Sequence, residues 1–319
     1  MIMTGAVIGT TMMEVKMGAT IGTSMLDQAR GVGPIVALTI NNICQLSCPM
    51  CYLETGHKTG LQLISPAVLT RMWSMCPARV AIVGKEALFN AKSRRVTADI
   101  VREGHDRGIP VDLITNGMNL ASFVKEYPDE VRLLHHIDVS IDAPHSQEQY
   151  EQCRPGGVLE NVICGIRLAQ KGGAEIRILN TLHATTLPWV EETVARSREL
   201  TDSWIMFSPF IATNRASGSH TMRMMEISTI VDVLSASPSF MANSRALVGF
   251  DPYYCEFSLE SLGSIQEAGR IFGDHLLIIK ETPAELGIVR ITYDGFVLDP
   301  FVALNTAQYP VAEKTRQIA

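Results

Sequence analysis

Long apolar runs and blocks of basic residues are absent from this sequence. No run of about 18 apolar residues occurs, so we expect no transmembrane helix. Residues 1–33 lack the basic start and long apolar core of a secretory signal, which predicts a cytoplasmic protein. The net charge is −6 without any Lys/Arg block. This charge pattern argues against a nucleic-acid-binding protein.

Paired cysteines are also absent outside one short segment. The chain has seven cysteines, an odd number, and three of them lie within eight positions. This pattern fits a thiol–metal site in a reducing compartment better than a disulfide framework. The length of 319 residues and the hydrophobic content of 46% allow a core large enough to fold without disulfides.

From residue 34 onward, short apolar runs alternate with helical patterns, which predicts βαβ units and a parallel sheet, hence an α/β fold. About six units are too few for a closed eightfold barrel. This leaves a partial (β/α)6 TIM-like barrel over residues 34–211 or a doubly wound sheet. The predicted strands are Ile35–Ile40, Val80–Val83, Val111–Ile114, Ile137–Ile141, Ile176–Leu179 and Trp204–Phe207. The predicted helices are Pro66–Met75, Arg95–Arg107, Ser146–Glu151, Gly157–Lys171 and Trp189–Leu200.

Two extensions flank the predicted barrel. Residues 1–33 contain a faint internal repeat, which predicts a hairpin. Residues 212–319 are less regular, but Gly287–Tyr293 and Phe296–Leu298 predict a strand pair joined by a tight Asp-Gly turn. We expect the C-terminal extension to close the barrel and to contribute to the substrate site.

The cysteine motif Cys44-x3-Cys48-x2-Cys51 follows directly on the first predicted strand. Three thiolates at this spacing surround one inorganic centre only from a loop, and soft thiolate ligands select iron–sulfur or zinc sites. Zinc sites usually take four protein ligands, and no partner pair of Cys or His follows at finger-like spacing. Three ligands instead leave one iron of a 4Fe–4S cluster open.

This spacing after a first strand resembles the radical S-adenosylmethionine (radical SAM) superfamily. The resemblance implies a partial barrel, one 4Fe–4S cluster held by Cys44, Cys48 and Cys51, and SAM chelated by the fourth iron. It also implies that an electron from a donor such as flavodoxin or ferredoxin cleaves SAM. The resulting 5′-deoxyadenosyl radical then abstracts a hydrogen atom from a substrate. Incidental or zinc-binding cysteines are the alternative.

Turn residues after the second and third strands extend the resemblance. Gly84-Lys85-Glu86 is similar to the superfamily's Gly-Gly-Glu motif, which implies that the Gly84 backbone and the Glu86 carboxylate hold the ammonium group of SAM. Lys85 replaces the second glycine and departs from that motif. Asn116, in a Thr-Asn-Gly turn, matches a turn common in the superfamily. Without the resemblance, both segments are ordinary polar turns.

Residues at the ends of the later strands complete the implied SAM site. Ser140 and Asp142 lie on one face of the fourth strand because side chains alternate, and the resemblance assigns both to SAM. Arg154 resembles the arginine that pairs with the SAM carboxylate, a task that suits a bidentate guanidinium. The resemblance also places Asn180 and Phe207 beside the adenine and ribose. An ordinary strand end is the alternative for each.

The remaining cysteines are scattered singly, which argues against a second cluster. Cys76 and Cys164 lie in apolar helical patterns, where a cysteine is usually buried, and Cys153 neighbours the implied SAM-binding arginine. Cys255 lies past the barrel in an aromatic, partly polar loop. A thiol placed there is a suitable hydrogen-atom donor to a carbon radical, and an inert loop cysteine is the alternative.

A late single cysteine after a minimal barrel resembles the radical SAM epimerases of aminoglycoside biosynthesis, of the neomycin C epimerase type. That resemblance implies inversion of a sugar carbon in a small natural product, with Cys255 as the catalytic hydrogen donor. Acidic residues such as Glu86 and Asp142 fit a polycationic aminosugar. The alternatives are a radical SAM dehydrogenase or dehydratase, and a zinc- or cluster-binding protein without turnover.

Overall fold

One eleven-stranded sheet organises the computed structural model, which describes residues 33–51, 60–210, 225–250, 268, 270–278, 288–298 and 316–317. The strand order is β11-β10-β9-β1-β2-β3-β4-β5-β6-β7-β8. Strands β1 to β8 are parallel, β9 pairs with β1 in parallel, and β10 and β11 add antiparallel. The strands are β1 Ile35–Leu38, β2 Arg79–Ile82, β3 Val111–Thr115, β4 His136–Ser140, β5 Ile176–Leu182, β6 Ile205–Pro209, β7 Ala246–Phe250, β8 Leu276–Ile278, β9 Ile288–Ile291, β10 Phe296–Leu298 and β11 Arg316–Gln317.

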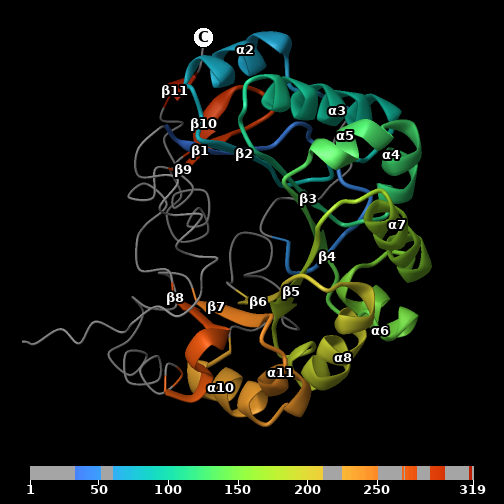
Figure 1. Cartoon of the computed structure of the whole chain (residues 1–319), viewed down its shortest axis with the longest axis vertical. Helices are drawn as coiled ribbons and strands as arrows, with labels where there is room; N and C mark the ends of the chain where they lie inside the picture. Colours follow the sequence, from blue (N-terminus) through green and yellow to red (C-terminus); the bar gives the residue numbers. More distant parts are fainter. Residues whose placement is uncertain are drawn as a thin grey trace, which may run out of the picture.

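Helices cover the outer side of the curved sheet (Figure 1). Several begin at side-chain caps: Ser65, Asn90 and Ser146 each accept a hydrogen bond from the backbone N–H three residues on, which satisfies a donor that the first turn leaves free. The helices are α2 Pro66–Ser74, α3 Ala91–Asp106, α4 Leu120–Glu126, α5 Pro128–Leu133, α6 Gln147–Cys153, α7 Leu159–Lys171, α8 Val190–Leu200, α10 Ile227–Ser235 and α11 Pro238–Ala242, with short 3-10 turns η1 Leu187–Trp189 and η2 Gly273–His275.

The two faces of the parallel strands differ in chemistry because successive side chains point to opposite sides. One face is apolar and packs with helix residues in the main core; it includes Val36, Leu38, Val80, Ile82, Leu113 and Ile137, all 0% exposed. The other face lines the inside of the curve and carries polar and charged residues, among them Asp112, Asp138, Ser140 and Arg177. The polar and charged side chains of these strands therefore lie on the inside of the curved sheet.

The predicted partial barrel is confirmed, and the six predicted strands correspond to β1–β6. In the described part of the chain the sheet stays open, with β8 and β11 at its edges. The sheet continues beyond residue 211, because β7 and β8 add two further parallel strands. The late strand pair is confirmed as β9–β10, with Gly295 in its turn at φ +83°. The domain boundaries remain a prediction, and the predicted N-terminal hairpin lies outside the described residues.

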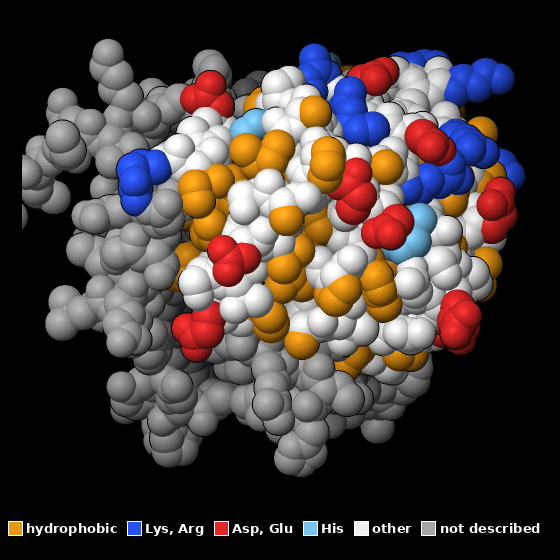
Figure 2. Space-filling view, turned by 90° about the horizontal axis from the view of Figure 1, so that it is seen from below, with side chains coloured by type: hydrophobic (Ala, Val, Ile, Leu, Met, Phe, Trp, Pro, Cys, Tyr) orange, Lys and Arg blue, Asp and Glu red, His pale blue; other side chains and the backbone are white. Residues whose placement is uncertain are grey.

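No helix among the described residues is long and apolar enough to cross a membrane. Figure 2 shows the molecule from below: on the described part of this face, Lys and Arg side chains gather mainly at the top and upper right, acidic side chains are scattered over it, and apolar side chains occupy the middle.

Candidate functional site

The loop after β1 carries the three predicted cluster cysteines at the carboxyl ends of the strands. Cys48 is buried, and Cys44 and Cys51 are half-buried. A turn hydrogen bond joins the Cys51 N–H to the Cys48 carbonyl at 3.2 Å. Around them lies a small apolar cluster of Leu46, Met50, Cys153 and Phe210, separate from the main core. The loop thus packs through this cluster against the end of α6 and the residue that follows β6.

The spread of the three sulfurs distinguishes between the two kinds of centre that the motif allows. Two thiolates on one zinc ion are at most about 4.6 Å apart, because each Zn–S bond is about 2.3 Å. Among the described residues, the three cysteines do not form a group whose ligand atoms all lie within 4.8 Å. A cluster that offers each thiolate its own iron fits this spread better than a single ion.

Burial acts directly on these thiols. It raises the pKa of the Cys44 thiol to about 12, and the nearby Glu86 carboxylate raises it further. Burial likewise raises the pKa of Cys48, although the Arg154 guanidinium opposes that rise. Iron binds the thiolate form, so binding of a cluster here releases protons and is coupled to pH.

Glu86 ties the turn after β2 to the turn after β3. It is 0% exposed; Oε1 accepts from the Leu88 N–H at 3.0 Å and the Thr115 hydroxyl at 2.7 Å, and Oε2 accepts from the Asn116 N–H at 2.8 Å. Asn116 in turn donates to the Cys44 sulfur at 3.6 Å. Each carboxylate oxygen has about two acceptor positions, so Oε2 keeps one further position beside the bond from Asn116.

Asp142 and Arg154 form a buried ion pair at the end of β4. The Arg154 Nε lies 2.7 Å from Asp142 Oδ2, and Asp142 Oδ1 accepts from the Thr181 N–H at 2.7 Å. The Arg154 Nη1 is 3.9 Å from the Cys48 sulfur. Ser140, half-buried on the inner face, lies two residues before Asp142. The structure therefore brings the predicted arginine and aspartate beside the cysteine loop.

Asn180 and His183, near the end of β5, carry buried polar atoms without hydrogen-bond partners: both amide atoms of Asn180, and His183 Nε2. Each such atom costs about 1–3 kcal/mol when it stays unpaired. A polar ligand that pairs with them recovers this energy. Together with the three thiols, Glu86 and the Asp142–Arg154 pair, this donor and acceptor set fits a cluster and the amino-acid and ribose groups of SAM.

Other predicted residues lie elsewhere or only border this group. The Phe207 side chain is 1% exposed and packs edge-on against Phe240 with ring centroids 5.8 Å apart; the structure does not bring it to the inner face. Gly84 forms a left-handed turn at φ +75° just before Glu86. Cys255 lies outside the described residues.

The single cysteines differ from our expectation. Cys76 and Cys164 are exposed, not buried: Cys76 follows the last turn of α2, and Cys164 falls beside the buried stripe of α7, which includes Ile163 and Ile166. Cys153 is 0% exposed and packs in the apolar cluster with Cys48. His183 also belongs to this end of the barrel; the sequence marks it as a possible polar site residue, together with His135, His136 and His220, but no motif or metal-ligand spacing distinguishes it from them.

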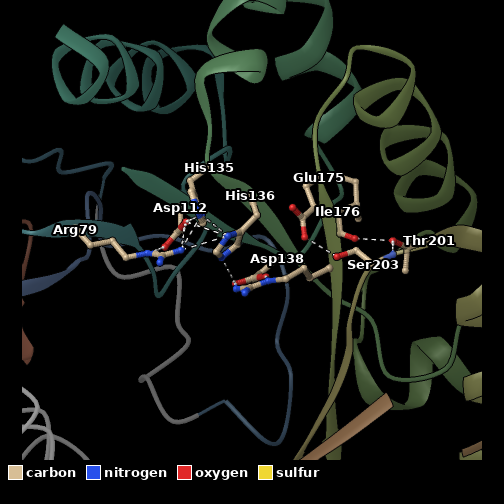
Figure 3. A network of polar contacts seen from close by, with 10 residues as sticks. Arg79, Asp112, His135, His136, Asp138, Glu175, Ile176, Thr201 and Ser203 are labelled. Atoms are coloured by element: carbon tan, nitrogen blue, oxygen red, sulfur yellow. Dashed lines mark hydrogen bonds and ion pairs between the residues drawn. The ribbon is translucent and has the colours of Figure 1, made fainter. Parts of the chain in front are cut away.

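A second polar network lies at the opposite, amino ends of the strands (Figure 3). Possible ligand atoms of Asp112, His135 and His136 lie within 4.8 Å of one another. The Arg79 Nη2 already fills the space between them, at 2.8 Å from Asp112 Oδ1, 2.8 Å from His135 Nδ1 and 3.3 Å from His136 Nδ1. A metal ion would have to displace this buried guanidinium, so the network is a neutralised ion cluster.

A sequence comparison agrees with the geometry of the cysteine loop. Residues 29–160 match the model of a family described as a 4Fe-4S single cluster domain, and this segment includes all three cysteines of the loop. No protein of curated function matches the chain in sequence.

Solved structures resemble the chain in fold. Streptococcus suis SuiB bound to its precursor peptide SuiA superposes with a TM-score of 0.64 at 11% identity, over 92% of this chain and 66% of that one. SuiB bound to S-adenosylmethionine gives 0.58 at 12%, over 91% and 64%. The protein anSMEcpe with bound AdoMet gives 0.56 at 15%, over 83% and 71%.

These likenesses define the class of fold. The chain spans less than two thirds of the length of SuiB. At these identities the likeness concerns the fold alone, an open TIM-like partial barrel. The family match and the fold together support the resemblance to the radical SAM superfamily.

Proposed function

We propose that this chain is a radical SAM enzyme whose Cys44, Cys48 and Cys51 hold one 4Fe–4S cluster. One observation carries the proposal: three cysteines of a single loop stand beside the buried Asp142–Arg154 pair and the Asn116 amide at the carboxyl ends of the strands. Barrel enzymes build their active sites at these ends. When bound, the cluster and SAM supply a 5′-deoxyadenosyl radical that removes a hydrogen atom from the substrate.

In this proposal, different residues of the chain bind different groups of SAM. Arg154 offers its guanidinium to the SAM carboxylate, since charge-assisted pairs of this kind are strong and directional. Glu86 offers the remaining acceptor position of Oε2 to the ammonium group. Asp142, held by the Thr181 N–H, orients Arg154. Asn180 stands opposite Phe207 in the pairing of β5 with β6, so its side chain lies on the same face of the sheet as Phe207, and its contact with the nucleoside stays a prediction.

Anaerobic reconstitution tests this assignment. We expect about four irons and four sulfides per chain, together with reductive formation of 5′-deoxyadenosine from SAM. About eight irons would indicate a second cluster, and would favour an oxidative reaction. Absence of both iron and SAM cleavage would overturn the proposal.

The finer proposal concerns the reaction, which we infer to be epimerisation of a sugar carbon in an aminoglycoside. A radical formed on one face of that carbon takes a hydrogen atom from the Cys255 thiol on the other face. An electron and a proton from the external reductant and solvent restore the thiol. In support, Cys76 and Cys164 are both exposed, and they belong to different elements, Cys76 following α2 and Cys164 lying in α7. A peptide substrate, as in the SuiB complex, is the competing candidate.

The fate of solvent hydrogen distinguishes these reactions. In D2O, wild-type protein given an aminoglycoside should produce an epimer with deuterium at the inverted carbon. Cys255→Ala should still form 5′-deoxyadenosine but no epimer, whereas Cys164→Ala, which changes an exposed cysteine, should behave as wild type. A keto or dehydrated product, or an epimer from Cys255→Ala, would overturn the epimerase proposal.

A further inference from the structure

His183 lies at the end of β5, and the proposed function assigns it no contact. It is the first residue after Leu182, which ends the strand, and it is 0% exposed. It lies two residues after Thr181, whose backbone N–H binds Asp142, at the end of the barrel where the cysteine loop lies. Because the side chain is fully buried, the surrounding residues and not solvent determine the orientation and protonation of its imidazole.

One hydrogen bond fixes the tautomer of this ring. The Thr185 backbone N–H donates to His183 Nδ1 at 3.2 Å, so Nδ1 is the acceptor. Burial lowers the pKa of His183, with Arg154 adding to this effect and Asp142 opposing it, which keeps the imidazole neutral. A neutral imidazole has one donor and one acceptor, so the hydrogen is on Nε2. That donor has no hydrogen-bond partner in the described part of the chain.

The surroundings of His183 connect this donor with the cysteine loop. Its ring meets the Phe210 ring edge-on, with centroids 6.4 Å apart, and Phe210 packs in the apolar cluster that contains Cys48. The Asp142–Arg154 pair is near enough to act electrostatically on the imidazole. Buried donors are almost always paired in native proteins. An oriented and unpaired N–H at this place therefore points to a ligand.

We propose that His183 binds SAM directly by donating its Nε2 hydrogen to an acceptor atom of that cofactor. This inference rests on the proposed function and adds a residue that none of the sequence motifs includes. The Nδ1 bond to Thr185 holds the ring in place, and Nε2 makes the contact.

Two substitutions separate the contact from the packing. Gln places an amide nitrogen close to the Nε2 position, whereas Asn places it close to Nδ1. On reconstituted protein, we expect His183→Asn and His183→Leu to weaken equilibrium SAM binding about tenfold, and His183→Gln to stay within about threefold of wild type. Iron content and the EPR signal of the reduced cluster without SAM should be the same in all four proteins.

The outcomes distinguish the two proposals. If the wild-type protein holds iron but does not bind SAM, the proposed function itself fails. If the wild type binds SAM and His183→Asn and His183→Leu bind it equally well, the inference about His183 is overturned while the function stands. Equal weakening in all three variants, including Gln, would assign His183 to packing against Phe210, and would also overturn the inference.

Discussion

The buried ion pairs at the two ends of the barrel have different surroundings. At the amino ends, Arg79 pairs with both carboxylate oxygens of Asp112, and Arg177 pairs with both oxygens of Asp138 at 2.6 and 2.7 Å. At the carboxyl ends, Arg154 Nε pairs with Asp142 Oδ2 at 2.7 Å, and this pair stands with three free thiols and the unpartnered Nε2 of His183.

This difference associates the amino ends of the sheet with stability and the carboxyl ends with function. A buried ion pair contributes when both partners are fully hydrogen-bonded, and the amino ends come close to this condition. Unpaired buried groups reduce stability, and they persist where a ligand completes them. We therefore expect substitutions at the amino ends to change unfolding, and substitutions at the carboxyl ends to change ligand binding.

The largest effect is expected at the cysteine loop. Cys48→Ala removes a ligand and should abolish both cluster retention and 5′-deoxyadenosine formation, because a cluster bound by two thiolates of this loop is not held. The measurements are iron per chain and SAM cleavage after reconstitution. Cys164→Ala is the matched control, since it removes an exposed thiol. Full iron retention by Cys48→Ala would exclude this loop as the cluster site.

Asp112→Asn tests the opposite end. This change leaves the Arg79 guanidinium buried without its counter-charge, and should lower the free energy of unfolding by about 3–5 kcal/mol. Asp129→Asn is the control, because Asp129 pairs with Arg132 at the exposed surface and should cost about 0–1 kcal/mol. Urea unfolding of both variants provides the comparison. Equal stabilities would show that the network at the amino ends contributes nothing.

Lowering the pH should test the contribution of the Asp112 carboxylate to stability without any substitution. Burial alone would raise the pKa of Asp112, but hydrogen bonds from His135 and Arg79 outweigh it and hold the pKa at about 2, below the ordinary 3.8. A lowered folded-state pKa stabilises the fold above the unfolded-state pKa. That contribution, about 2 kcal/mol, is lost as the pH falls from about 4 through about 2. Chemical unfolding at several pH values should show this loss in wild type and a smaller loss in Asp112→Asn.

The sequence alone was sufficient for the parts of the fold whose signal is local. Strands β1–β6 could be predicted because each is a short apolar run between helical patterns. The strands β7 and β8 could not, since a five-residue and a three-residue strand in an irregular tail lack that context. Strand β5 extends to Leu182, beyond the predicted Leu179, because Asn180 and Thr181 continue the pairing with β6, and backbone pairing is independent of side-chain polarity.

The candidate site likewise has parts that the sequence alone can predict and parts that it cannot. The cysteine motif is contiguous, so its spacing could be recognised without a structure. Arg79 and Asp112 are 33 residues apart and meet only because β2 and β3 are neighbours, which no local pattern reveals. The role inferred for His183 depends on a hydrogen bond from Thr185 and on the absence of another partner among the described residues, and neither can be derived from residue types.

The smallest effect is expected from backbone strain. Lys85 and Cys76 are the non-glycine residues of the described chain with positive φ, at +46° and +49°, and lie at opposite ends of the barrel. Lys85→Gly should raise the free energy of unfolding by up to about 1 kcal/mol, because glycine adopts this conformation without a Cβ clash. Cys76→Gly is the matched control and should give a similar gain. Neither change should alter SAM affinity, since Glu86 is held by its own three hydrogen bonds. Weaker SAM binding by Lys85→Gly alone would assign the lysine side chain to the site, at a position where the superfamily motif has glycine.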